Sequence, residues 1–344
     1  MSSFYELSYN ELKDIITANG LSARGANVLY NWHYKKKNFE PCVEDLSKGT
    51  KELVYGAMSF GLPRISHIQK ASDLTVKFLF ELEDGSKVET VLIPFNRKYS
   101  VCLSTQVGCA MKCSFCFTGM QGLKRNLKVH EIIGQLMMVH KWLGENRPGP
   151  DARILNVVFM GQGEPLHNFD AVKKACDILI AQEGASMAAQ RITVSTSGYL
   201  PGLMRWKDEM PGVNLALSLH SPFDEIRNEL IPINQRYPLK EVLKFIDDIP
   251  LHRKQFVTYE YLLIKNLNDS EEDAKALAEL LKDKRAIINL IPFNPVPGSH
   301  YQRPELSTVR AFEEVLVSYK IPTMVRVTKG DDILAACGQL NTNS

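Results

Sequence analysis

The sequence predicts an α/β fold, namely a partial (β/α)6-type TIM barrel preceded by a small helical domain. The main observation is that apolar, strand-like runs alternate with amphipathic helical stretches from about residue 99 onwards, as in parallel βα units. The length of 344 residues suits one barrel-sized domain with a small appendage. No Gly-x-Gly-x-x-Gly turn follows the first run, which argues against a dinucleotide-binding fold.

The individual elements follow from hydrophobic periodicity. The expected strands are 99–105, 154–160, 191–196, 213–219, 256–263, 286–292 and 322–327. The expected helices are 128–143, 168–183, 224–230, 238–248, 270–282 and 304–319. We expect functional side chains at the carboxyl ends of these strands, where barrels of this kind carry their sites.

Two further segments are expected in front of the barrel, which spans 99–344. Residues 1–70 are expected to form a helical accessory domain, because apolar residues between Leu12 and Trp32 recur at helical spacing. Residues 71–98 are expected to form a β-hairpin extension or linker, because two apolar runs flank the turn dipeptide Asp84-Gly85.

Composition limits the protein class. Hydrophobic residues make up 44% and charged residues 23% of the chain, so a sizeable core is expected and disorder is not. No apolar run approaches the roughly 20 residues of a membrane span, and the start lacks the pattern of a secretory signal. A cytoplasmic protein without membrane contact is expected.

The net charge of +2 neither requires nor excludes a nucleic-acid partner. Basic clusters at 35–37, 124–128 and 282–285 are either local patches for such a partner or ordinary solvated surface.

Three of the seven cysteines, Cys109, Cys113 and Cys116, fall within eight residues with the spacing C-x3-C-x2-C. In a reducing cytosol such crowding indicates metal binding or catalysis rather than a disulfide framework. Thiolates suit iron–sulfur clusters or zinc. Three local thiolates can hold three irons of a [4Fe–4S] cluster and leave the fourth iron open. The alternatives are a structural zinc site, which needs four protein ligands although no second CxxC pair is present, or cysteines without a ligand.

The cysteine spacing resembles the signature of the radical S-adenosylmethionine (SAM) superfamily. The resemblance implies a [4Fe–4S] cluster on these cysteines, whose open iron binds SAM and whose electron cleaves it to a 5′-deoxyadenosyl radical. The segment around Gly163 and Glu164 is similar to the superfamily motif that holds the SAM amino group. Glycine lets backbone approach a ligand, and a carboxylate pairs with an ammonium group. The other SAM contacts expected at strand ends are Ser195, Ser218, Leu219, His220 and Asn294, although each taken singly is also ordinary loop chemistry.

A closer resemblance covers nearly the whole chain. Residues 116–127, the stretch 218–222 and above all the segment Lys329 to Leu340, which ends in Ala-Cys-Gly-Gln-Leu, are similar to the RlmN/Cfr family of RNA adenine methyltransferases. This resemblance implies that Cys337 carries a methyl group from one SAM, that Cys102 resolves a protein–RNA crosslink by disulfide formation, and that Glu89 accepts a proton. The C2 carbon of adenine is electron-poor and not a nucleophile, which explains why a radical route through a protein-bound methyl group is needed.

The resemblance also implies the substrate and partners. Its C2 branch, RlmN, modifies adenosine in 23S ribosomal RNA and in some cases tRNA, and three segments of this chain favour that branch over the C8 branch. A flavodoxin- or ferredoxin-type electron donor and a monomeric protein are expected. The open alternatives are C8 methylation, another radical SAM activity, and a non-enzymatic RNA-binding module stabilised by a metal.

Overall fold

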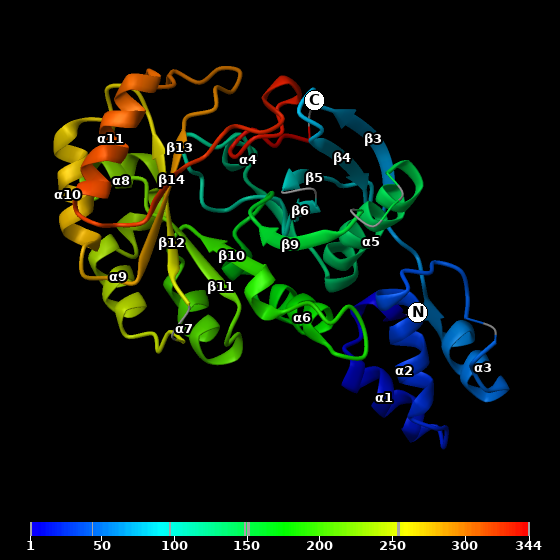
Figure 1. Cartoon of the computed structure of the whole chain (residues 1–344). Helices are drawn as coiled ribbons and strands as arrows, with labels where there is room; N and C mark the ends of the chain where they lie inside the picture. The colour runs from blue at the N-terminus through cyan, green and yellow to red at the C-terminus, as the bar shows by residue number, and fades with distance from the viewer. Residues whose placement is uncertain are drawn as a thin grey trace.

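The structure is a computed structural model and describes residues 2–42, 44–95, 98–147, 149, 152–252 and 255–342. Within these residues one large sheet has the strand order β14-β13-β12-β11-β10-β9-β6-β5-β4-β3 (Figure 1). Neighbouring strands are parallel from β6 to β14, as the alternating pattern predicts. Its strands are β3 (Arg64–Lys70), β4 (Val76–Glu81), β5 (Lys87–Phe95), β6 (Lys98–Cys102), β9 (Ile154–Phe159), β10 (Ile192–Thr196), β11 (Asn214–Ser218), β12 (Val257–Leu263), β13 (Ala286–Pro292) and β14 (Thr323–Val325).

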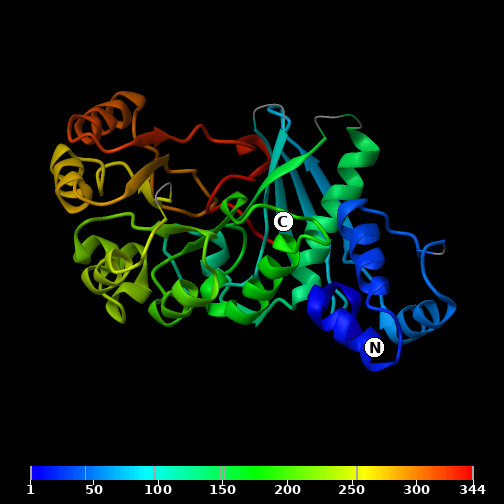
Figure 2. The same ribbon diagram turned by 60° about the horizontal axis from the view of Figure 1, so that its bottom comes forward.

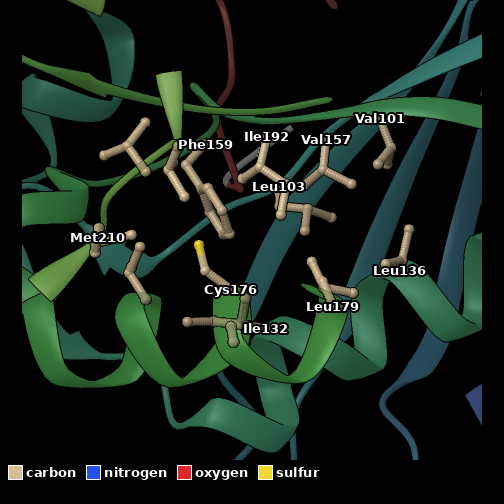
Figure 3. Packing of buried hydrophobic residues seen from close by; sticks show 14 of the residues in the cluster. Val101, Leu103, Ile132, Leu136, Val157, Phe159, Cys176, Leu179, Ile192 and Met210 are labelled. Carbon is tan, nitrogen blue, oxygen red and sulfur yellow. The ribbon is translucent and has the colours of Figure 1, made fainter. Parts of the chain in front are cut away.

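Helices that connect the parallel strands bury their apolar sides against the sheet. They are α5 (Val129–Asn146), α6 (Phe169–Ile180), α7 (Leu200–Glu209), α8 (Asp224–Leu230), α9 (Leu239–Asp247), α10 (Glu271–Leu281) and α11 (Leu306–Ser318). Figure 3 shows Cys176 of α6 pointing toward the strand residue Phe159. Cys176 is 1% exposed, so it serves as a small core residue.

Helix α7 is absent from the elements that the sequence predicts. Its first turn contains Pro201 and Gly202, which together indicate a turn in a sequence. Proline is tolerated in the first turn of a helix because the N–H it lacks has no partner there. A Cβ on Gly202 would lie 2.5 Å from the carbonyl oxygen of Leu166. The glycine therefore permits close packing of α7 on the loop after β9 and does not end the helix.

The expectation that residues 1–70 are helical is wrong for their last part. Residues 64–70 form β3, which pairs antiparallel with β4 and, with β5, extends the sheet beyond β6. A β-bulge shifts the register between Ile65 and His67, so the apolar residues Ile65 and Ile68 are three positions apart. The bulge removes the two-residue alternation by which a strand is identified. Asn96 and Arg97, inside the range expected for the hairpin, lie outside the described residues.

In the N-terminal part, the described residues form three α-helices, a 3-10 helix (Phe4–Glu6), a π-helix (Asn31–Lys35) and a two-stranded parallel ladder. Figure 2 shows this part at one end of the molecule. Ser8 and Glu11 form a capping box at the start of α1. His130 of α5 lies 2.6 Å from Glu6, and Lys174 of α6 forms an ion pair with Glu11, so this part contacts the helices of the barrel. Its elements are β1 (Ser2–Ser3), α1 (Tyr9–Ala18), α2 (Arg24–Tyr30), α3 (Lys48–Ala57) and β2 (Met58–Ser59). Among the described helices, none combines the length and apolar character that a bilayer crossing requires.

The buried histidine of this N-terminal part makes stability depend on pH. His33 is 1% exposed between the rings of Phe4 and Phe60, and burial lowers its pKa to about 4. As the pH falls below about 6.5, His33 binds a proton in the unfolded chain but not yet in the folded protein. The free energy of unfolding therefore decreases between about pH 6.5 and about pH 4. We expect His33→Gln to remove about 2 to 3 kcal/mol of the stability difference between about pH 7 and pH 4.5, measured by urea unfolding. Identical pH dependence in both proteins would contradict this expectation.

Candidate active site

The three clustered cysteines lie in a loop that leads from a short strand to a short helix, and a second short strand follows the helix. The strands β7 (Gln106–Gly108) and β8 (Leu123–Asn126) pair, and α4 (Phe117–Met120) follows Cys116. Gly108 has φ 76°, and a Cβ there would lie 1.8 Å from the carbonyl oxygen of Gly122, so only glycine fits where the loop closes. The N–H of Cys116 donates to the carbonyl of Cys113 at 3.2 Å, which turns the chain between them.

All three thiols line one cavity, here called the first cavity. Burial raises the pKa of each thiol, for Cys109 to about 12, and the charges of Cys116 and Cys109 raise that of Cys113 further. Thiols in such a site ionise when a multivalent cation offsets their repulsion and desolvation. Within the described residues, no three His, Cys, Asp or Glu side chains converge on a point where one metal ion would fit. Three thiolates match the three protein-bound irons of a [4Fe–4S] cluster, whereas a structural zinc site takes four protein ligands, so this donor set fits a cluster.

Gly163 and Glu164 form the wall of the first cavity after β9. A Cβ on Gly163, whose φ is 104°, would lie 2.6 Å from the side chain of Gln106, so the motif requires glycine. Glu164 is 4% exposed and accepts hydrogen bonds from the backbone N–H and the hydroxyl of Ser197, each at 2.8 Å. Burial raises the pKa of Glu164, and the bonds from Ser197 oppose that rise. The carboxylate thus lies in the cavity wall, suitably placed for a cationic ligand.

Of the other predicted SAM contacts, Ser195, Ser218 and His220 also line the first cavity. His220 has φ 59°, and burial lowers its pKa to about 3, so its ring is neutral. Its Nδ1 accepts the N–H of Leu262, which leaves the proton on Nε2. Leu219 is fully buried and is not among the lining residues, so the structure places its side chain in the core.

Asn294, the last of the predicted SAM contacts, lies beside the backbone of Cys337. Its side chain lines a second cavity and does not line the first. Its Nδ2 donates to the carbonyl of Cys337 at 3.3 Å, while its Oδ1 accepts bonds from Arg303 and Thr328. In this structure Asn294 therefore holds the backbone of Cys337.

The second cavity brings together the two cysteines that the resemblance singles out. Cys102, the last residue of β6, and Cys337 both line it, although they are far apart in the sequence. Cys337 also lines the first cavity, as does Cys116, so the two cavities share a wall. Cys337 is exposed, whereas Cys102 is buried, and burial raises the pKa of Cys102 to about 12 with Arg326 acting in the opposite direction. Neither forms a disulfide.

Glu89, the predicted proton acceptor, is 2% exposed and does not line either of these cavities. It lies on β5 two residues before Val91, which does line the second cavity, so both side chains are on one face of the strand. Its carboxylate pairs with Lys77 at 3.0 Å and accepts the N–H of Asn341 at 2.6 Å. Burial raises the pKa of Glu89, and Lys77 opposes this rise.

Sequence reasoning missed a carboxylate and an arginine at this site. Glu260, in the middle of β12, is 6% exposed and lines the first cavity, where it accepts a hydrogen bond from Ser195 at 3.2 Å. Its second oxygen, Oε1, has no hydrogen bond and lies 3.8 Å from Arg326. Arg326 lines the second cavity. An isolated polar residue inside an apolar strand, such as Glu260, was the available signal.

Arg227 holds the carboxyl ends of β10 and β11 in place beneath the first cavity. It is fully buried and donates to the carbonyls of Leu219 at 3.0 Å, Ser197 at 2.8 Å and Ser218 at 3.1 Å. We expect Arg227→Met to lower the free energy of unfolding by about 3 kcal/mol, because several buried acceptors lose their donor. Denaturant unfolding measures this. Arg205→Met, at a surface arginine with two ion pairs, is the control and should cost less than about 1 kcal/mol. Equal losses in the two variants would contradict the assignment.

Comparisons with known proteins agree with this geometry. The sequence pattern of the Radical SAM superfamily matches residues 103–278. A dual-specificity RNA methyltransferase RlmN from Bdellovibrio bacteriovorus is 41% identical over 341 residues, which are 99% of this chain and 84% of that protein. A probable dual-specificity RNA methyltransferase RlmN from Dictyoglomus thermophilum is 40% identical over 99% of this chain and 97% of that protein. The crystal structure of a radical SAM methyltransferase from Sphaerobacter thermophilus superposes with a TM-score of 0.89 at 36% identity, covering 99% of both chains.

The fold and the cysteine loop therefore define a radical SAM enzyme, which confirms the predicted fold class. Within that class, the chain belongs to the RlmN family of RNA methyltransferases. Membership makes it a SAM-dependent methyltransferase and implies SAM and a [4Fe–4S] cluster as cofactors.

Proposed function

We propose that this enzyme methylates C2 of an adenosine in 23S ribosomal RNA, and also acts on tRNA, through an S-methylcysteine at Cys337. The observation that carries the proposal is the position of Cys337 in the wall between two cavities. The first cavity contains the three clustered cysteines, and the second contains Cys102. A group carried on Cys337 would thus have access to both places. The names of the relatives, which are dual-specificity RNA methyltransferases, support RNA as the substrate.

The residues of the first cavity fit the two cofactors. Cys109, Cys113 and Cys116 would hold a [4Fe–4S] cluster, and the carboxylate of Glu164 would pair with the SAM amino group. Ser195, Ser218 and His220 supply hydroxyl and ring N–H groups for the remaining polar atoms of SAM. When bound, cluster and SAM supply both the methyl group and the radical that activates it.

The residues of this chain carry the group and release the product. Cys337 bears the methyl group, which would lose one hydrogen atom to the radical supplied from SAM. The carbon then bonds to C2 of the base, and C2 loses its proton and one electron, which the oxidised cluster would take back. Cys102 then forms an S–S bond with Cys337, the C–S bond breaks, and its electron pair stays on the transferred carbon, which takes up a proton to become methyl. Glu89 is proposed to accept the proton that C2 loses, for which its raised pKa is suitable.

The substrate must present an unstacked base, since the cavities lie inside the barrel. Arg326 and Lys329 line the second cavity and are cations close to the proposed base site. Lys35 to Lys37 of the N-terminal part remain proposed RNA contacts. Arg125, also considered from sequence, forms ion pairs with Asp84 and Glu131 and so stabilises the loop instead. We further propose a cytoplasmic monomer that receives electrons from a flavodoxin- or ferredoxin-type protein.

The test is isotopic. Protein reconstituted under anaerobic conditions receives SAM with a deuterated methyl group, and adenosines from digested RNA are analysed by mass spectrometry. Methyladenosine modified at C2 and carrying a CHD₂ group is expected, because one deuterium is removed to activate the carrier and one proton is added at release. A CD₃ group would exclude the S-methylcysteine route, and modification at C8 would assign the chain to the other branch. No methylated adenosine would overturn the proposal.

A further inference from the structure

The C-terminal segment that carries Cys337 is attached to the antiparallel part of the sheet through a buried ion pair. Lys77 of β4 and Glu89 of β5 lie 3.0 Å apart, and their side chains are 5% and 2% exposed. Each of these two side chains also forms a hydrogen bond with a backbone group of the C-terminal segment. The Lys77 ammonium donates to the carbonyl of Leu334 at 3.2 Å, and the Glu89 carboxylate accepts the N–H of Asn341 at 2.6 Å.

The two anchored residues lie on either side of Cys337. Leu334 is three residues before it and Asn341 is four residues after it, so one ion pair holds both ends of a short loop with the cysteine near its middle. Leu334 has φ 51°, a conformation that leucine rarely adopts and that the surrounding contacts must maintain. In Figure 1 the C-terminal segment runs across from α11 toward β4 and α4.

The register of the sheet explains why the anchor lies beside the second cavity. Lys77 pairs with Val91 and Leu79 pairs with Glu89, so Lys77 and Glu89 are diagonal neighbours on one face. Val91 pairs in turn with Cys102, and both line the second cavity. The anchor and the cavity thus share one face of the sheet.

A pair that served stability alone would not need the C-terminal segment. Two buried charges are costly to desolvate, and bonds from a charged group to backbone are stronger than neutral ones. Here each charged group also forms a hydrogen bond with the backbone of the loop that carries Cys337. The thiol of Cys337 must meet reacting atoms in two cavities. Misplacement of a reacting group by about 1 Å can cost about 100-fold in rate.

We propose that Lys77 is a positioning residue, which acts with Glu89 to hold residues 334–341 so that Cys337 stays in the wall between the two cavities. Glu89 then has an anchoring role in addition to the proton transfer proposed above. The importance of Cys337 rests on the proposed function, whereas the anchoring itself does not.

The test is hydrogen exchange of the full chain measured by mass spectrometry, without SAM or RNA. In Lys77→Met we expect amides of residues 334–341 to exchange about tenfold faster, while peptides of β9 to β12 keep their rates. Lys77→Arg, which retains a charged donor, should restore most of the protection. Lys87→Met, at an exposed lysine on the same hairpin, is the matched control and should change nothing at 334–341. Methyl transfer by Lys77→Met should fall about 100-fold in kcat with the KM for RNA unchanged.

A second variant covers the case in which Lys77→Met exchanges faster everywhere because it fails to fold. Lys77→Met with Glu89→Leu removes both buried charges and should keep the fold while releasing residues 334–341. Unchanged exchange at 334–341 in a folded variant lacking Lys77 would overturn the inference. If the wild-type protein methylates no RNA while this exchange difference is found, the proposed function fails and the anchoring stands.

Discussion

Replacing Cys102 with alanine is expected to leave RNA covalently attached to the protein at Cys337. Cys102 lines the second cavity together with Cys337, and the charge of Cys337 adds to the rise in the pKa of Cys102. If the product is released by formation of an S–S bond, a protein without the Cys102 sulfur can form the carbon bond to the base but cannot break the C–S bond. Released methyladenosine should fall by at least about 100-fold, since the nucleophile itself is lost. A denaturing gel detects the adduct, and mass spectrometry of the nuclease-treated protein locates it.

Cys176→Ala is the matched control for this experiment. Like Cys102, Cys176 is buried, but it lies on the core-facing side of α6 and lines neither cavity. Its replacement should give no adduct and normal release of methylated RNA. Release of methylated RNA at the wild-type rate by Cys102→Ala would refute the role of Cys102, and an adduct in Cys102→Ala/Cys337→Ala would refute the role of Cys337.

The other large effect is expected at the cluster loop. We expect Cys113→Ala to abolish retention of iron and inorganic sulfide after anaerobic reconstitution, because only two thiolates would remain for the cluster. Changes merely beside a metal ligand cost about 10- to 100-fold in affinity or activity, and loss of the ligand itself should exceed that range. Iron and sulfide analysis, visible absorption and cleavage of SAM measure the loss.

Cys42→Ala controls for the loss of a thiol as such. Cys42 is fully buried in the N-terminal part, and its variant should bind iron and sulfide as the wild type does. Full methyl transfer by Cys113→Ala, or a wild-type protein that binds zinc in place of iron and sulfide, would disprove the cluster assignment.

Local patterns in the sequence determined most of the fold. The alternation of apolar runs and amphipathic stretches located β6 and β9 to β14 within a few residues, because strand and helix periodicities are properties of short segments. The cysteine spacing is equally local, and the loop that it predicts requires only a tight turn at Gly108. The sequence did not predict β3, because its bulge disrupts the alternation of apolar residues. It did not predict α7 either, because Gly202 permits close packing where a glycine usually indicates a turn.

The arrangement of the site was decided by tertiary structure. Asn341 and Glu89 are 252 residues apart in the sequence, and nothing local to either indicates that the N–H of one binds the carboxylate of the other. The same is true of Glu260 with Arg326, and of Asn294 with the backbone of Cys337. Sequence patterns specify segments, because periodicity and spacing act over a few residues. Which side chains share a cavity depends on the order and register of the strands, which only the folded sheet sets.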